Sequence, residues 1–393
     1  FWALSASWRL SQEKFMQSLK SVLSDLKLRA SYGVNGNLPS SYYGYQSTYT
    51  TGAFYNGKPS PWESTLGNEE LTWEKNYALN LGLDISLFSR VNVSLDWYTR
   101  TTKDLLMSKQ LNSISGFSSL LTNVGQMRNT GVELEVRSNN IKTKDFSWTT
   151  AFNLSHNKNK ILKLADLPWF VDGRYVRKEG YPFNTIYLRE YAGVDPETGS
   201  ALYYDNQQDE NGNYTKNKVT DPGQASPIPL KDITPTISGG FMNTFNYKFI
   251  DLSFNLSYSF GGYSYDNASY ILQDDGYSVI SNKSTEQRRR WQKPGDITDV
   301  PRFVYGNKKG GNYNSSRAIH STDHIRLKSL ILGLNAPKAW LQKLGIGNAR
   351  IYFSGTNLLT WAAYGQYDPE MSGVVGFYTP PLKTYAFGLE LKF

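Results

Sequence analysis

Apolar and polar residues alternate one by one along much of this chain, a period that predicts β-strands rather than helices. In the final segment, 383–393, one face is wholly apolar and the other carries small or charged residues. The apolar positions are Tyr385, Phe387, Leu389, Leu391 and Phe393. This pattern fits the closing strand of a membrane barrel, whose apolar face meets lipid, although a strand of a soluble sandwich would alternate in the same way.

The same alternation recurs, most clearly at 250–260, where Ile250, Leu252 and Phe254 alternate with Asp251 and Ser253. Further runs lie at 3–10, 26–34, 77–87, 91–98, 132–137, 146–155, 237–249, 325–334 and 350–356. A tilted strand needs about 9–11 residues to cross a bilayer, whereas sandwich strands average about 5–6. The runs therefore favour an all-β fold, a transmembrane antiparallel β-barrel, over a soluble β-rich protein.

Composition agrees with a barrel. Mean hydropathy is only -0.50, yet aromatic residues make up 15% of the chain. A barrel protein looks hydrophilic on average because alternate strand residues face lipid, while Tyr and Trp gather at the two membrane interfaces. The sequence contains no cysteine, which excludes disulfides, thiolate metal sites and a cysteine nucleophile.

The formal net charge is +8, which invites a nucleic-acid-binding interpretation. The positive residues are spread along the chain, however, and the densest cluster is only 288–290. No zinc-finger, helix-turn-helix or RNA-recognition pattern accompanies it. We therefore expect no nucleic-acid partner.

The connections between the expected strands are of two kinds. Some are tight, such as 88–90 and the corner at 248–251, and suit the periplasmic side of a barrel. The long ones, expected to be extracellular loops, lie at approximately 35–72, 102–128, 158–184, 193–234, 262–322 and 361–382. Loops of this length usually carry function.

Several segments carry a resemblance to a known family. They read SASWRLSQEKF at 5–15, LKLRASYG at 26–33, LTWEK at 71–75, WYTRTTKDLL at 97–106, NVGQMRNTGVEL at 123–134, YAGVDPETG at 191–199, DHIRL at 323–327, NLL at 357–359 and YDPE at 367–370. In these segments and in their order, the whole chain resembles the C-terminal barrel portion of SusC/RagA-type TonB-dependent transporters of Bacteroidetes.

The resemblance implies the fold and location of a larger protein. It implies a barrel of 22 strands plugged by an N-terminal domain in the outer membrane, with residues 1–393 supplying about a dozen strands. The chain opens on a strand-like segment without an initiator Met or a signal peptide. We therefore expect the plug, the first strands and the segment that contacts TonB to lie upstream.

The resemblance also implies import rather than catalysis. A SusD-like lipoprotein would close over the extracellular mouth, TonB would act on the plug, and the cargo would be an oligosaccharide or a peptide. Flat aromatic faces suit both kinds of cargo, although the same residues could pack the loops or lie in the interfacial belt. The candidate contacts are Tyr42, Tyr43, Tyr45, Tyr55, Trp62, Tyr203, Tyr204, Tyr263 and Tyr265.

No other constellation indicates a cofactor, a metal or a catalytic site. His320 and His324 are four residues apart, but not on an expected helix that would turn them toward one ion. The acidic stretch 205–213 lacks the glycine and terminal Glu spacing of a calcium loop. Two other classes stay open: a plug-less outer-membrane pore or adhesin, and a soluble secreted β-rich binding protein or enzyme.

Overall fold

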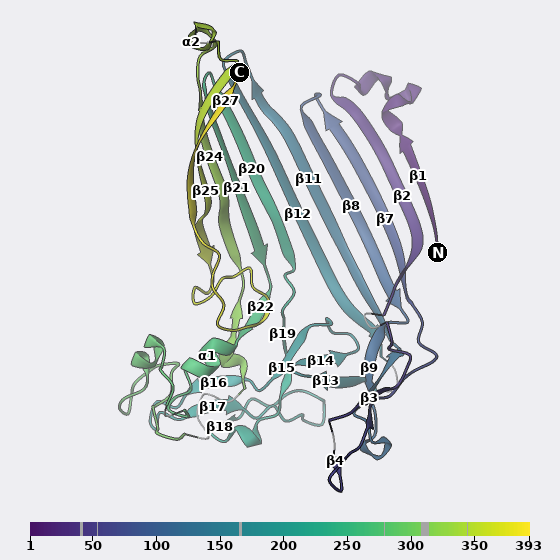
Figure 1. Cartoon of the computed structure of the whole chain (residues 1–393), viewed down its shortest axis with the longest axis vertical. Helices are drawn as coiled ribbons and strands as arrows, with labels where there is room; N and C mark the ends of the chain where they lie inside the picture. The colour runs from purple at the N-terminus through teal and green to yellow at the C-terminus, as the bar shows by residue number, and fades with distance from the viewer. Residues whose placement is uncertain (40–41, 53, 165–166, 279, 308–313, 344) are drawn as a thin grey trace. The chain divides into compact units, whose positions relative to one another are not determined.

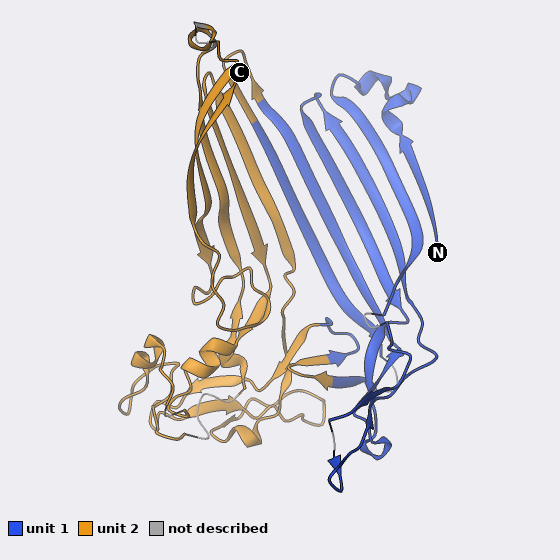
Figure 2. Ribbon diagram, viewed as in Figure 1, with its two compact units in different colours: residues 1–140, 149–170, 177–183 blue, residues 141–148, 171–176, 184–393 orange. Residues whose placement is uncertain are grey.

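The computed structural model describes residues 1–39, 42–52, 54–164, 167–278, 280–307, 314–343 and 345–393. Within it the chain forms two compact units (Figure 2). Unit 1 comprises residues 1–140, 149–170 and 177–183, and unit 2 comprises residues 141–148, 171–176 and 184–393. Among the described residues, no helix is long and apolar enough to cross a membrane.

Long antiparallel strands make up most of unit 1 (Figure 1). In hydrogen-bonded order they are β1 (Trp2–Arg9), β2 (Leu23–Asn37), β7 (Glu74–Leu87), β8 (Val91–Lys103), β11 (Gln126–Lys142) and β12 (Phe146–Lys163), of which β12 begins in unit 2. Each expected run in this part of the chain lies inside one of these strands, except that the run 3–10 ends one residue beyond β1.

Unit 2 repeats the arrangement. Its long strands are β20 (Ile237–Tyr247), β21 (Ile250–Phe260), β24 (His324–Asn335), β25 (Asn348–Ala362) and β27 (Thr384–Lys392), paired antiparallel in this order. The expected strand 237–249 ends two residues early, because Lys248 adopts a left-handed backbone with φ of 52° at the turn to β21. The segment 348–362 is longer than expected.

The two faces of these strands differ as the alternation predicts. On one face of β27 the apolar side chains are exposed, Phe387 to 82%. On the polar face of unit 1, Arg29 donates to both Asp84 at 2.8 Å and Asp96 at 2.9 Å. Gly82 lies in this polar layer, where an added Cβ would come within 2.6 Å of the Asp96 carboxylate. An ordered ionic layer on one face and bare apolar side chains on the other fit a wet lumen and a lipid surface.

Short turns join β7 to β8, β11 to β12 and β20 to β21, while residues 10–22 and 336–347 join β1 to β2 and β24 to β25. The other ends of the strands lead into the long connections (Figure 1). The long connections are not structureless, because buried backbone needs hydrogen-bond partners and forms short sheets. Their strands are β3 (Thr48–Thr50), β4 (Phe54–Tyr55), β5 (Lys58–Pro59), β6 (Trp62–Thr65), β9 (Leu106–Gln110), β10 (Ser119–Asn123), β13 (Trp169–Asp172), β14 (Tyr175–Lys178), β15 (Thr185–Leu188), β16 (Tyr191–Val194), β17 (Ala201–Tyr204), β18 (Lys218–Val219), β19 (Ile228–Asp232), β22 (Tyr263–Asp266), β23 (Ile319–Ser321) and β26 (Gly373–Val375).

Helical turns are few and short. They are η1 (Leu10–Gln12), η2 (Lys14–Leu19), η3 (Ser113–Ser115), η4 (Pro222–Gln224), α1 (Asn267–Leu272), η5 (Thr285–Arg289), η6 (Ser316–Ala318) and α2 (Lys338–Lys343). The buried apolar clusters lie in the connections and beside them rather than among the long strands. In unit 2, for example, Ile186, Leu188, Tyr265 and Ala318 pack together.

Candidate functional site

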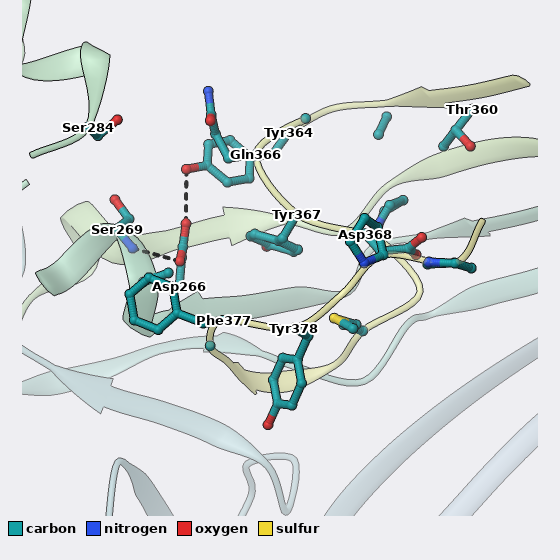
Figure 3. Close-up of a pocket in the computed structure, with 18 of the residues that line it drawn as sticks. Asp266, Ser269, Ser284, Thr360, Tyr364, Gln366, Tyr367, Asp368, Phe377 and Tyr378 are labelled. Atoms are coloured by element: carbon teal, nitrogen blue, oxygen red, sulfur yellow. Dashed lines mark hydrogen bonds between the residues drawn. The ribbon is translucent and has the colours of Figure 1, made fainter. Parts of the chain in front are cut away.

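A cavity of about 660 Å³ opens in unit 2, at the end of the strands where the long connections lie. It is lined by α1, by the end of β25, and by the connection from β25 to β27, residues 363–383 (Figure 3). Its size is that of a small-ligand site.

A small sheet fixes the last connection to the wall of the cavity. β22 pairs antiparallel with β23, and on its other side it pairs parallel with β26. Because β26 belongs to the connection 363–383, this pairing holds a segment distant in sequence against β22. The end of β22 then leads directly into α1.

Asp266, the last residue of β22, organises one wall (Figure 3). Its carboxylate caps α1 by accepting the Ser269 N–H at 2.8 Å and also accepts the Tyr364 hydroxyl at 3.1 Å. The Tyr364 ring stacks on His320 at 3.7 Å between centroids. Burial, with the nearby Asp266 charge, raises the pKa of Tyr364 above its usual range, and burial lowers the pKa of His320. The tyrosine therefore stays a neutral hydrogen-bond donor and the imidazole favours its neutral form.

A buried ion pair organises the opposite wall. Arg326 on β24 is 2% exposed and donates to Asp368 at 2.6 Å and to Glu370 at 2.9 Å. Its third contact is the Thr360 hydroxyl at 3.1 Å. Since Asp368 and Glu370 belong to the last connection, this ion pair is a second anchor for it.

The remaining lining is polar and aromatic. Asp368 is paired with Arg326, so its charge is matched within the wall. Amide and hydroxyl groups add to the polar lining, from Asn357, Gln273, Gln366, Ser284 and Thr360, and Lys383 adds an ammonium group. Phe377 and Tyr378 also line the cavity, and their side chains are 67% and 63% exposed. Exposed rings beside amides and hydroxyls provide flat apolar faces and directional hydrogen bonds.

The aromatic residues expected to contact cargo do not form one site. Among the described residues, none of the nine lines this cavity. Those of unit 1 lie on the connection from β2 to β7 with large exposed fractions, Tyr42 at 89%, Tyr43 at 66%, Tyr45 at 45%, Tyr55 at 79% and Trp62 at 61%. They are free to meet another molecule, and their role in binding stays a prediction.

The four in unit 2 have packing partners. Tyr203 is fully buried and packs edge-on against Tyr191 at 5.9 Å. Tyr265 is 1% exposed and donates its hydroxyl to Asn314 at 2.7 Å. Tyr204 and Tyr263 are half-buried, each beneath a lysine ammonium 5.1 Å from the ring centroid. These contacts favour loop packing, which the sequence left open as an alternative, most clearly for Tyr203 and Tyr265.

Sequence reasoning missed the aromatic residues of the cavity, Tyr364, Tyr367, Phe377 and Tyr378. A signal for them exists. All four fall within 361–382, a connection already expected to be long, and Tyr367 opens its YDPE segment. What the sequence does not contain is the parallel pairing of β26 with β22 that folds this connection back over α1.

The other polar groups singled out in the sequence serve local structure. Asp209 accepts the N–H groups of Asn211 and Asn213 within its own turn, at 2.9 and 2.8 Å. The Nδ1 atom of His324 lies 2.8 Å from the Thr322 carbonyl. His320 and His324 lie on different strands, β23 and β24.

Comparisons with known proteins agree with this architecture. The family described as "TonB dependent receptor-like, beta-barrel" matches residues 1–223. The TonB-dependent receptor P3 of Formosa agariphila is 32% identical over 98% of this chain and 41% of its own length. The TonB-dependent receptor SusC of Bacteroides thetaiotaomicron is 28% identical over 100% of this chain and 40% of its own length.

A solved structure matches equally well. The structure of the RagAB peptide transporter covers all of this chain with a TM-score of 0.88 and 31% sequence identity, and the match spans 43% of that chain. The chain thus spans about two fifths of the length of the relatives that it matches.

Proposed function

Because this chain belongs to the TonB-dependent receptor family, among the relatives of SusC and RagA, we propose that the protein of which it is part is a nutrient importer. The family places it in the outer membrane as the C-terminal part of a β-barrel. Oligosaccharides or peptides are the proposed cargo. The observation that carries the proposal is the agreement of the whole chain with the RagAB peptide transporter, at a TM-score of 0.88.

The proposed cycle needs partners outside this chain. A SusD-like lipoprotein closes over the long connections, an upstream plug fills the barrel, and TonB acts on that plug. The exposed aromatic connection from β2 to β7 supports a contact with either the lid or the cargo, because Tyr42 and Tyr55 are 89% and 79% exposed. Large exposed aromatic side chains are typical of the centres of interfaces.

The cavity of unit 2 is the proposed cargo contact in this chain. Its rings, Phe377 and Tyr378, provide flat faces, and its amides and hydroxyls provide hydrogen bonds. The negative charge of Asp368 on the wall is paired with Arg326. This chemistry fits a sugar ring or a peptide segment, whose hydroxyl or carbonyl oxygens can also accept from the Lys383 ammonium. Contact with a cargo of this kind needs no catalytic group, in keeping with a family of transporters rather than of enzymes.

The first test separates import from passive diffusion. We expect growth on a single oligosaccharide or peptide source to fail when the gene is deleted, and to fail equally when TonB is deleted. Uptake that persists without TonB would refute energised import and favour a pore or an adhesin. A protein that stays in solution without detergent would instead favour a secreted binding protein.

The second test addresses the cavity. We expect Phe377→Ala with Tyr378→Ala to weaken cargo binding to the purified complex at least tenfold, measured by calorimetry, because stacking and apolar contact are lost. Tyr305→Ala is the matched control, since Tyr305 is 79% exposed in the same unit but does not line the cavity. Equal affinity for both variants would remove the cavity from the proposal and leave import untouched.

A further inference from the structure

A groove of about 520 Å³ lies on the apolar face of unit 1. Trp8 on β1 stands on one side and Trp97 on β8 on the other. The opposite face of the same strands carries the ion pairs of Arg29 with Asp84 and Asp96, which belong to the wet lumen. The groove therefore faces the hydrocarbon of the membrane.

The groove is hollow because small residues meet at its floor. Ala6 is directly opposite Ala30 in the pairing of β1 with β2, so two methyl groups stand where neighbouring positions carry large side chains. Beside this floor, Leu28 is opposite Leu83, and Leu81 is opposite Trp97. Leucine and indole walls around an alanine floor form a slot with apolar sides, suited to an alkyl chain.

The position of the groove along the strands selects one leaflet. Leu83 lies near the end of β7 at Leu87, and Leu95 lies near the start of β8 at Val91, beside the tight turn that joins the two strands. With about 3.3 Å of rise per residue, the groove begins about 13 Å along the strand from that turn. Tight turns of outer-membrane barrels are periplasmic, so the groove opens into the periplasmic leaflet.

The connection that follows Trp8 carries cationic and apolar groups. The connection between β1 and β2 carries exposed Lys14 and Lys20, with Phe15 at 65% and Leu19 at 49% exposure between them. The neighbouring carboxylate, that of Glu13, accepts the indole N–H of Trp8 at 2.9 Å. Lysines interspersed with exposed apolar residues are typical of a segment that lies in the headgroup region and attracts anionic lipid.

We propose that this surface is a binding site for one anionic glycerophospholipid of the periplasmic leaflet. An acyl chain lies in the groove between Trp8 and Trp97, and the phosphate lies beside Lys14 and Lys20. Each methylene of the acyl chain that enters the groove favours binding, because it makes closer van der Waals contacts there than among other lipid chains. The site is separate from the cargo cavity and does not depend on the imported molecule.

Native mass spectrometry of the full complex, purified in detergent from outer membranes, tests this assignment. After delipidation, we expect one added phosphatidylglycerol to be retained at least tenfold more strongly than phosphatidylcholine. Ala6→Leu with Ala30→Leu fills the floor and should abolish retention of that molecule. Lys14→Gln with Lys20→Gln should preserve binding but remove the preference for phosphatidylglycerol.

Ala349→Leu is the matched control, because Ala349 is opposite Leu391 on the apolar face of unit 2, away from the groove residues. Retention equal in this control and in the filled variant would overturn the proposal, as would a retained lipopolysaccharide in place of the phospholipid. A loss of self-association in the filled variant would overturn it too, by assigning the groove to a second copy of the chain.

A second measurement uses the wild-type groove, so that it does not depend on whether the double leucine variant folds. Phosphatidylglycerol with brominated acyl chains should quench tryptophan fluorescence in a saturable step, and Trp97→Phe should remove a part of that step. Quenching that rises without saturation, or that is identical in Trp97→Phe, refutes a defined site beside Trp97.

Discussion

Arg326 is the residue whose loss should most clearly release the last connection. It is 2% exposed, and it joins β24 to Asp368 and Glu370 on the segment 363–383. Arg326→Gln removes the charge but keeps a polar side chain. Glu370 retains a partner in Lys328 at 2.6 Å, whereas the Asp368 side chain, 7% exposed, loses its counter-ion.

The free-energy cost of Arg326→Gln follows from the carboxylate of Asp368, which is left without a counter-ion. Breaking a buried ion pair by removing one partner costs about 3–5 kcal/mol. The lower end applies, since Glu370 is 30% exposed and stays paired. About 3 kcal/mol corresponds to roughly a hundredfold increase in the equilibrium constant for opening of the connection.

Hydrogen–deuterium exchange of the complex measures this opening. We expect peptides within 363–383 to exchange roughly a hundredfold faster in Arg326→Gln, and adding Asp368→Asn should recover most of the protection because no charge is then left unpaired. Lys328→Gln is the control, since the Lys328 side chain is 35% exposed and such a pair contributes about 0–1 kcal/mol. Unchanged exchange in Arg326→Gln, or no recovery in the double variant, would refute the anchoring role.

Three further predictions concern other parts of the chain. Burial lowers the pKa of His320, so the folded protein favours the neutral ring, and the stability that this contributes is present above about pH 6.5 and is lost as the pH falls. The protection of β23 amides, taken relative to their intrinsic exchange rate at each pH, should therefore fall between pH 7 and 5 in the wild type but not in His320→Phe. Asp266→Ala removes the cap of α1 and the hydrogen bond to Tyr364. Loss of the cap alone should cost about 0.5–2 kcal/mol of helix stability and speed hydrogen exchange in α1, and unchanged exchange would contradict the capping role. Gly131→Val places a side chain against the His156 carbonyl and should lower the yield of folded, heat-modifiable barrel on gels. Gly52→Val is the control, because the space around Gly52 is open, and equal yields of the two variants would disprove the clash.

The long strands could be predicted from the sequence because the alternation of apolar and polar residues is present within each strand. In β21, for example, Leu252 and Phe254 alternate with Asp251 and Ser253, and no distant residue is needed to recognise the strand. The ends were less certain, since a turn such as that at Lys248 depends on one left-handed residue. The short strands of the connections have two to five residues, too few for any period to show.

The candidate site was harder to predict, because an aromatic residue in a long connection can be exposed or buried with the same neighbours in sequence. Tyr42 and Tyr203 were equal candidates, yet one is 89% exposed and the other fully buried. The difference arises from partners far along the chain, such as Tyr191 for Tyr203. The cavity likewise depends on β22 meeting β26, a parallel pairing that local sequence does not encode.

The polar layer of unit 1 also constrains how this sequence can diverge. The Arg29 guanidinium occupies the volume where a Cβ at position 82 would stand, with its Nη1 2.6 Å from that atom. The Asp96 carboxylate lies equally close to that atom, at 2.6 Å. Ala at 82 therefore requires both the Arg29 and the Asp96 side chains to move, and a shorter residue at 29 would leave the contact with Asp96 and remove the shared cation of the carboxylates at 84 and 96. The glycine and the three charged residues are therefore coupled, and descendants of this sequence should change them together or keep them all.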